Sequence, residues 1–354
     1  MNARRIAVIA GDGIGQEVVP AAIRCLDRVA EVHELDLRWE HLEWGSDHYR
    51  RTGRMMPVDG LDVLAGYDAI FLGAVGVPDI PDVETLWGLL IPIRRRFDQY
   101  VNLRPVRTLP GVRSPLRAGE DIDLVIVREN TEGEYSEIGG RLYRGLPQES
   151  AMQESVFTRH GVTRIARFAA RLAASRRGRM TSATKSNGIV HTMPFWDEVV
   201  ASTVAETPEV ELRSELIDAL AASLVLRPQR YDVIVASNLF GDILSDLGSA
   251  LTGSIGVAPS ANLNPEGRHP SLFEPVHGSA PDIAGQGVAN PIGQIWSGAL
   301  MLDALGHRDA AADLTSAFEA ALADGIRTRD LGGTVGTDEM ADAVLQRIAM
   351  GVRA

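Results

Sequence analysis

The chain has 354 residues, 45% of them hydrophobic, which is enough to bury a core larger than that of one typical domain. Its 47 acidic and 35 basic residues give a net charge of −12, which argues against nucleic acid as a partner. The single cysteine, Cys25, excludes an internal disulfide and favours a cytoplasmic location, and no apolar run is long enough for a membrane helix, so no membrane partner is expected.

Short apolar segments alternate along the chain with longer segments of helical periodicity, which is typical of an α/β protein with a largely parallel sheet. Strands are predicted at residues 6–10, 69–72, 124–127 and 233–236. The first strand is followed by a glycine loop, residues 11–15, and by a helix over residues 18–32. Because Gln16 stands where the dinucleotide fingerprint G-x-G-x-x-G needs its third glycine, the loop favours a plain strand-to-helix turn over a Rossmann phosphate site.

Two segments, residues 103–118 and 254–275, are rich in residues that interrupt regular structure. They predict irregular connections at which the chain crosses between two interleaved lobes. Ligands of α/β proteins favour the crevices that such crossings create.

Asp242 and Asp246 lie four residues apart in a segment of helical pattern, which puts both carboxylates on one helix face. Like charges in this arrangement destabilise a helix unless a cation lies between them. Oxygen ligands of this type suit Mg²⁺ or Mn²⁺, so the spacing is consistent with a metal site. On spacing alone, two solvated aspartates remain the simpler explanation.

Other candidate side chains carry the chemistry of anion binding and proton transfer. Arg94, Arg104 and Arg128 can offer forked donors to a small polycarboxylate, although an ordinary basic surface explains them equally well. Tyr135 lies in a loop rich in acids and glycine, where a phenol can pass a proton, and Lys185 lies among small polar residues. Neither residue is diagnostic in isolation.

Together, the motifs resemble the β-decarboxylating dehydrogenases, the family of isocitrate, 3-isopropylmalate, tartrate and D-malate dehydrogenases. The matching motifs cover residues 11–15, 102–105, 128–133, 238–246 and 277–285. The resemblance extends over essentially the whole chain. It implies an α/β fold of the isopropylmalate/isocitrate dehydrogenase type rather than a Rossmann fold. It further implies a large, cofactor-binding lobe of residues 1–101 and 255–354, and a small lobe of residues 102–254 with the metal site and the dimer interface.

The resemblance also assigns roles to individual positions. The catalytic pair is Tyr135 and Lys185, and the substrate is held by Arg94, Arg104, Arg128, Trp87 and Leu90. The metal carboxylates are Asp218, Asp242 and Asp246. The cofactor positions are His277, Gly278, Ser279, Ala280, Asp282, Ile283, Asn290 and Asn187. Arg95 and Arg96 are left as surface charges. Because the lysine, Asn187 and one aspartate reach the site from the other subunit in this family, a homodimer with shared active sites is implied.

Within the family, the loop of residues 86–100 is most similar to the tartrate and D-malate enzymes. Trp87 stands where isopropylmalate enzymes carry a glutamate, and it is expected to fill the space of a large substituent on substrate carbon C3. Asp282 and Ile283 match the NAD version of the cofactor motif, because an anionic Asp282 suits ribose hydroxyls and repels a 2′-phosphate. Mn²⁺ or Mg²⁺ is implied as the metal, and a monovalent cation such as K⁺ is a further cofactor to test.

The expected activity is NAD-dependent oxidation, with decarboxylation, of a small 2-hydroxy dicarboxylic acid such as D-malate or tartrate. One alternative is 3-isopropylmalate dehydrogenase, which the loop containing Trp87 disfavours. A non-catalytic regulatory subunit is an alternative of a different class, and it is disfavoured because the catalytic pair and the metal aspartates are all present. A generic nucleotide-binding Rossmann protein is disfavoured by the broken glycine pattern.

Overall fold

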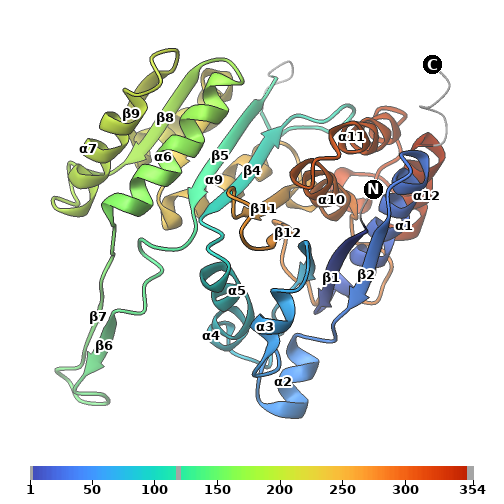
Figure 1. The fold of residues 1–354 in the computed structure, drawn as a ribbon, viewed down its shortest axis with the longest axis horizontal. Coiled ribbons are helices and arrows are strands. Elements are labelled where there is room, and N and C mark those ends of the chain that lie inside the picture. The colour runs from blue at the N-terminus through green and yellow to red at the C-terminus, as the bar shows by residue number, and fades with distance from the viewer. Residues whose placement is uncertain (1–2, 117–120, 349–354) are drawn as a thin grey trace. The chain divides into compact units, whose positions relative to one another are not determined.

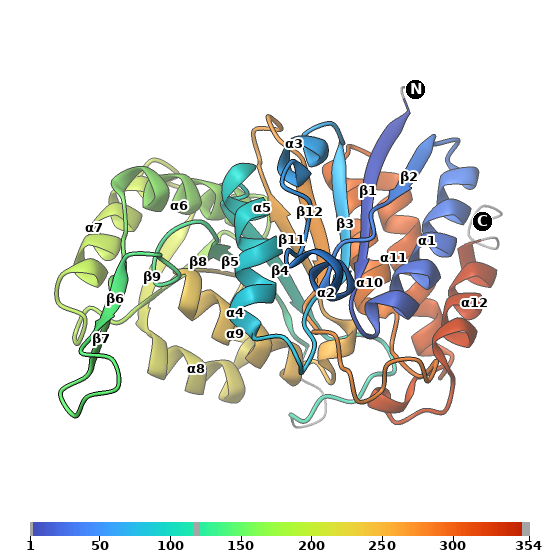
Figure 2. The ribbon, with the colours of Figure 1, turned by 90° about the horizontal axis from the view of Figure 1, so that it is seen from below.

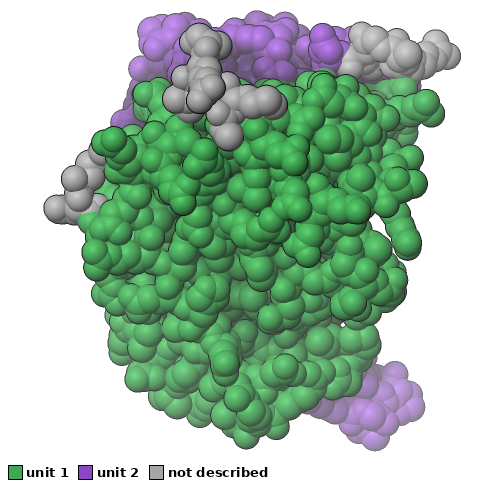
Figure 3. Space-filling model, turned by 90° about the vertical axis from the view of Figure 1, so that its right-hand side faces the viewer, with its two compact units in different colours: residues 1–99, 107–118, 249–354 green, residues 100–106, 119–248 purple. Residues whose placement is uncertain are grey.

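The computed structural model describes residues 3–116 and 121–348 (Figure 1). The chain divides into two compact units, each assembled from segments that are far apart in the sequence (Figure 3). Unit 1 comprises residues 1–99, 107–118 and 249–354, and unit 2 comprises residues 100–106 and 119–248. None of the helices in the described part of the chain has the length and apolar character that crossing a membrane requires.

Unit 1 contains the first half of the strands in spatial order. Its order is β2 (Leu37–His41), β1 (Arg4–Gly11), β3 (Ala69–Ala74), β12 (Ser271–Pro275) and β11 (Pro259–Leu263). The pairs β1–β2, β1–β3 and β12–β3 are parallel, whereas β11–β12 is antiparallel. The predicted strands at residues 6–10 and 69–72 are confirmed as parts of β1 and β3.

Helices cover both faces of this sheet, which explains why β3 is buried along its whole length. On one side lie α1 (Gly15–Val32), α10 (Ile292–Ala304), α11 (Arg308–Ala323) and α12 (Thr337–Ile348) (Figure 2). The smaller elements of the unit are α2 (Ser46–Thr52), α3 (Gly60–Leu64), α4 (Asp82–Thr85), the π-helix η1 (Leu86–Leu90), α5 (Ile91–Arg96) and the 3₁₀ turns η3 (Ile255–Val257) and η4 (Arg329–Leu331). Because strand side chains alternate, Ile9 and Ile70 join the cluster formed with Leu89 and Phe97 around α5.

Unit 2 contains the remaining strands of the large sheet. Its order is β4 (Val101–Arg107), β5 (Asp123–Glu129), β10 (Val233–Ala236), β8 (Arg179–Thr184) and β9 (Glu211–Leu216). The last four strands are parallel, and β5 and β10 contain the predicted strands at residues 124–127 and 233–236, which are confirmed. The helices are α6 (Arg159–Ala174), α7 (Thr192–Val204), α8 (Ile217–Leu226), the 3₁₀ turn η2 (Pro228–Arg230) and α9 (Asn238–Leu251). An exposed antiparallel hairpin of β6 (Gly139–Leu142) and β7 (Ser150–Gln153) extends away from these helices (Figure 1).

The segments predicted to be irregular contain more regular structure than expected. Residues 103–107 belong to β4, and residues 254–275 include β11 and β12, so the prediction was wrong for these parts. Proline did not prevent strand formation because Pro259 begins β11 and Pro275 ends β12.

The two units differ from the predicted lobe boundaries chiefly at residues 107–118, which group with unit 1. The physical reason is that Arg107 forms an ion pair with Glu319 and lies over the ring of Trp296, while Ser114 donates a hydrogen bond to the main chain of Leu251. The division into a cofactor lobe and a metal lobe stays a prediction.

Candidate active site

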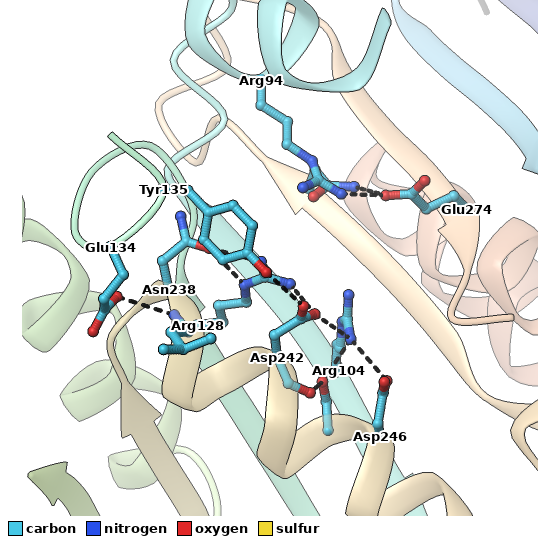
Figure 4. Close-up of polar contacts among 12 residues, drawn as sticks. Arg94, Arg104, Arg128, Glu134, Tyr135, Asn238, Asp242, Asp246 and Glu274 are labelled. Atoms are coloured by element: carbon cyan, nitrogen blue, oxygen red, sulfur yellow. Dashed lines mark hydrogen bonds and ion pairs between the residues drawn. The ribbon is translucent and has the colours of Figure 1, made fainter. Parts of the chain in front are cut away.

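Five predicted site residues of unit 2 lie together, and we name them the arginine–aspartate cluster: Arg104, Arg128, Tyr135, Asp242 and Asp246 (Figure 4). Arg128 forms an ion pair with Asp242. The Arg104 Nη1 atom lies 3.4 Å from Asp242 Oδ1 and 3.6 Å from Asp246 Oδ1. The Tyr135 hydroxyl donates a 3.2 Å hydrogen bond to the other carboxylate oxygen of Asp242. A phenol, two guanidinium groups and two carboxylates therefore converge on the first turns of α9.

The electrostatics of this cluster follow from unequal burial. The side chains of Arg104 and Arg128 are 9% and 3% exposed, whereas that of Asp246 is 60% exposed. Partial burial raises the pKa of Asp246, and the charge of Asp242 acts in the same direction, while Arg104 opposes both. Because buried guanidinium groups need anionic partners, Asp242 neutralises both arginines here, and a substrate carboxylate is the natural competitor for them.

The fold aims Arg128 by placing it at the carboxyl end of a parallel strand, the edge at which α/β proteins bind ligands. Asn238, the first residue of α9, accepts hydrogen bonds from Arg128 Nε at 3.1 Å and Nη2 at 2.6 Å. Gly241 makes room for the same side chain, since a Cβ atom there would lie 2.6 Å from Arg128 Cβ and Cγ.

Lys185 and Asp218 form a second pair in unit 2. The Lys185 Nζ atom lies 2.7 Å from Asp218 Oδ1, and this contact lowers the pKa of the aspartate. Lys185 follows β8, Asp218 lies in the first turn of α8, and Asn187 is exposed in the intervening segment. In the described residues no three acidic, histidine or cysteine side chains gather around one point, so Asp218 does not join Asp242 and Asp246 within a single chain.

Asp242 and Asp246 match a hard divalent cation in ligand type and in their position one turn apart on α9. Two aspartates are fewer than the six ligands that Mg²⁺ usually takes, so substrate, water or another chain must supply the rest. The raised pKa of Asp246 indicates a carboxylate that gains from a cation. The residues present therefore fit a divalent metal ion.

In unit 1, Arg94 on α5 is buried in an ion pair with Glu274, with 2.9 Å between Nη2 and Oε1 (Figure 4). Asn262 donates a 2.8 Å hydrogen bond to the same oxygen of Glu274. Trp87 and Leu90 lie in the π-helix η1, an element that often marks functional segments. The expectation that Arg95 is a plain surface charge was wrong, because its guanidinium stacks over the ring of Trp87 at 5.0 Å.

The predicted cofactor positions of unit 1 lie in one segment, residues 277–290, which we name the cofactor loop. Its conformation depends on the glycine loop after β1, because Ile14 N donates a 2.8 Å hydrogen bond to Ser279 O. Glu17 on α1 accepts hydrogen bonds from two further main-chain amides of the cofactor loop, those of Gly285 and Gly287. The glycine loop thus supports a binding segment from behind.

Within the cofactor loop, burial lowers the pKa of His277, which is therefore neutral at pH 7. Its Nε2 atom is buried and meets no hydrogen-bond partner in the described part of the chain. A Cβ atom at Gly278 would meet open space, Ala280 adopts a positive φ of 41°, and Asp282 is exposed. Asn290 instead uses its side-chain amide within the protein, donating to Asp330 at 3.0 Å. An unpaired ring nitrogen beside open space and an exposed carboxylate fit a nucleotide.

The family is decided by comparison with known proteins. A family model described as isocitrate/isopropylmalate dehydrogenase matches residues 5–344. The chain belongs to the isocitrate/isopropylmalate dehydrogenase family. Within this family it is similar to the probable tartrate dehydrogenase/decarboxylase of Bacillus subtilis (strain 168), with 54% identity over 98% of this chain and 99% of the relative. The D-malate dehydrogenase [decarboxylating] of Escherichia coli (strain K12) shows the same identity and coverage.

A solved structure of isocitrate dehydrogenase from Methylococcus capsulatus matches with a TM-score of 0.89 and 34% identity, covering 98% of this chain and 99% of that one. The predicted isocitrate dehydrogenase-type α/β fold and the predicted resemblance to the tartrate and D-malate members of the family are therefore confirmed. Membership of a dehydrogenase family supports an enzyme.

Sequence reasoning missed three residues that hold predicted site residues in place: Glu274, Glu17 and Asn238. Asn238 opens a motif that was recognised, and Glu274 lies three residues before His277, so proximity to a motif was the available signal for both. No comparable signal marks Glu17, because its partners lie about 270 residues later in the chain.

Proposed function

We propose that this chain is an NAD-dependent, Mn²⁺- or Mg²⁺-dependent enzyme that oxidises and decarboxylates a small 2-hydroxy dicarboxylic acid. D-Malate would give pyruvate and CO₂, and tartrate would give oxaloglycolate or, from meso-tartrate, D-glycerate. The observation that carries this proposal is the arginine–aspartate cluster, where two buried guanidinium groups face two carboxylates and a phenol. The printed names of the similar B. subtilis and E. coli proteins support the same reaction class.

Substrate binding follows from the buried charges. Arg104 and Arg128 exchange part of their contact with Asp242 for the substrate carboxylates, and their low exposure strengthens the new pairs. Arg94, fixed by Glu274, is the third arginine assigned to the substrate. Trp87, with Leu90 beside it in η1, limits the space at C3 to hydrogen or hydroxyl.

Proton transfer is assigned to two residues because protons leave and arrive at different atoms. When bound, a divalent cation at Asp242 and Asp246 polarises the C2 hydroxyl and stabilises negative charge on its oxygen, and NAD accepts the hydride from C2. Lys185 takes the hydroxyl proton, and Tyr135 delivers a proton to the carbon that loses CO₂. The Tyr135 hydroxyl, 3.2 Å from Asp242, is held with its proton directed into the cluster.

We also propose that the active enzyme is a homodimer with shared sites. Asp218 pairs with Lys185 in this chain and does not reach Asp242. A second subunit supplying Lys185, Asn187 and Asp218 would complete the metal and proton-transfer groups around the arginine–aspartate cluster. Residues His277 to Ile283 would receive the nucleotide, with the neutral His277 ring against the adenine.

The decisive experiment measures NADH formation and CO₂ release with D-malate, L-tartrate, meso-tartrate and 3-isopropylmalate, with and without Mn²⁺. We expect activity with at least one of the first three acids, loss of activity in a chelator, and recovery when Mn²⁺ or Mg²⁺ is restored. Equal turnover of 3-isopropylmalate and D-malate would favour an isopropylmalate dehydrogenase instead. A chelated enzyme that reduces NAD at the full rate would refute the metal-dependent mechanism.

A further inference from the structure

The segment between β5 and β6, which we name the Tyr135 loop (residues 130–138), is rich in acids whose carboxylates all find main-chain donors. The buried Glu129, just before the loop, accepts hydrogen bonds from the amides of Thr131 and Glu132 and so closes the start of the loop on itself. Glu132 accepts from Thr158 N at 2.9 Å and Oγ1 at 2.8 Å, at the N-terminus of α6. One end of the loop is thereby attached to α6.

Glu134 attaches the same loop to a different helix. Its Oε1 atom accepts a 2.7 Å hydrogen bond from Ser237 Oγ, and its Oε2 atom accepts a 3.0 Å hydrogen bond from Leu239 N (Figure 4). Leu239 is the second residue of α9, and its amide has no acceptor in the first turn of the helix itself. A carboxylate at this place also interacts favourably with the positive end of the helix dipole.

The contact with α9 matters because that helix carries the partner of Tyr135. Asp242 lies about one turn beyond Leu239, and its carboxylate accepts the hydrogen bond from the Tyr135 hydroxyl. Glu134 is the chain neighbour of Tyr135, so its two hydrogen bonds set the distance between the main chain that bears the phenol and the helix that bears the aspartate. The contact of Glu132 with α6 constrains the loop but not its distance from Asp242.

We infer that Glu134 is a positioning residue, which acts through Tyr135 by holding its phenol opposite Asp242 at the start of α9. The inference rests on the proposed function only for the role of Tyr135 as the proton donor to carbon. Its consequence is selective: removing Glu134 should slow delivery of that proton and leave substrate binding and hydride transfer largely intact.

The test compares E134A and E134Q with the wild-type holoenzyme, using D-malate. We expect E134A to lower kcat about tenfold, the scale of losing one or two net hydrogen bonds, with little change in KM. The solvent isotope effect on kcat should rise and the isotope effect of deuterium at C2 should fall, because proton delivery then limits the rate. E134Q should be intermediate, since its single amide oxygen can keep one of the two donors.

Two further variants separate positioning from a general weakening of the loop. E132A removes the contact with α6, and we expect it to lower thermal stability without producing the isotope signature. On a Y135F background, E134A should cause no additional loss of kcat, because both substitutions act on one phenol. The inference is overturned if E132A reproduces the kinetics of E134A, or if the two losses in E134A/Y135F are additive.

Hydrogen exchange provides a readout that does not depend on activity. E134A should increase amide exchange in residues 131–137 and in the first turn of α9, and unchanged exchange in both segments would overturn the inference. If the wild-type protein oxidises none of the tested acids, the proposed function fails, while the exchange measurement still decides whether Glu134 holds the loop.

Discussion

Gly241 offers a sharp test of whether Arg128 binds substrate, because the glycine is what lets this arginine cross α9. In G241A the new methyl group would lie 2.6 Å from Arg128 Cβ and Cγ and 3.1 Å from Arg128 Cα, so the stem of the arginine must move. Overpacking costs about 1–3 kcal/mol, and replacing a helical glycine by alanine returns about 1 kcal/mol. We therefore expect the free energy of unfolding to fall by about 0–2 kcal/mol.

The effect on substrate should be larger than the effect on stability. Displacing Arg128 disturbs its forked contact with Asn238 and the charge-assisted pair it would form with a substrate carboxylate, which is worth about 1.5–3 kcal/mol. This predicts a KM for D-malate that rises about 10- to 100-fold.

The matched control is G248A in the same helix, where the new Cβ would lie 2.8 Å from Cγ2 of Val106. That substitution crowds a hydrophobic contact, so we expect a loss of stability with an unchanged KM. Steady-state kinetics and urea unfolding of both variants decide the matter. If G241A and G248A change KM equally, or if neither changes it, the assignment of Arg128 to the substrate is refuted.

Three further predictions concern the cofactor, the substrate and pH. Asp282 is exposed in the cofactor loop, so D282K should raise kcat/KM for NADP relative to NAD, and an unchanged ratio would count against its role beside the ribose. W87A should increase turnover of 3-isopropylmalate relative to D-malate by opening space in η1, whereas R96A, which alters an exposed residue of α5, should leave this ratio unaltered. Burial raises the pKa of Glu129 from 4.5 to about 7, so the folded state binds this proton more tightly than the unfolded chain, and the free energy of unfolding should fall as pH rises from about 4.5 to 7. The 2.5-unit difference between these two values corresponds to at most about 3 kcal/mol; E129Q should flatten this slope in urea titrations, and an identical slope would exclude Glu129 as its source.

Local patterns in the sequence were sufficient for much of the fold. The alternation of apolar strands with amphipathic helices located β1, β3, β5 and β10, and the four-residue spacing of Asp242 and Asp246 placed them one turn apart on α9. The same reasoning failed at β11 and β12, because a buried antiparallel pair with proline at its ends has the composition of a connection. The spacing of two aspartates also could not distinguish a solvated pair from one that neutralises buried arginines.

The amino-acid sequence by itself determined the elements, the family motifs and the residue types available for chemistry, because periodicity and turn formation depend on neighbours within a few residues. Only the tertiary structure decided which charge each of those residues meets. Arg94 finds Glu274 across 180 positions of sequence, and Glu134 finds the start of α9 across more than 100. Such pairs are selected by how strands and helices pack and by the need to satisfy every buried charge, and that information is distributed over the whole fold rather than contained in any one segment.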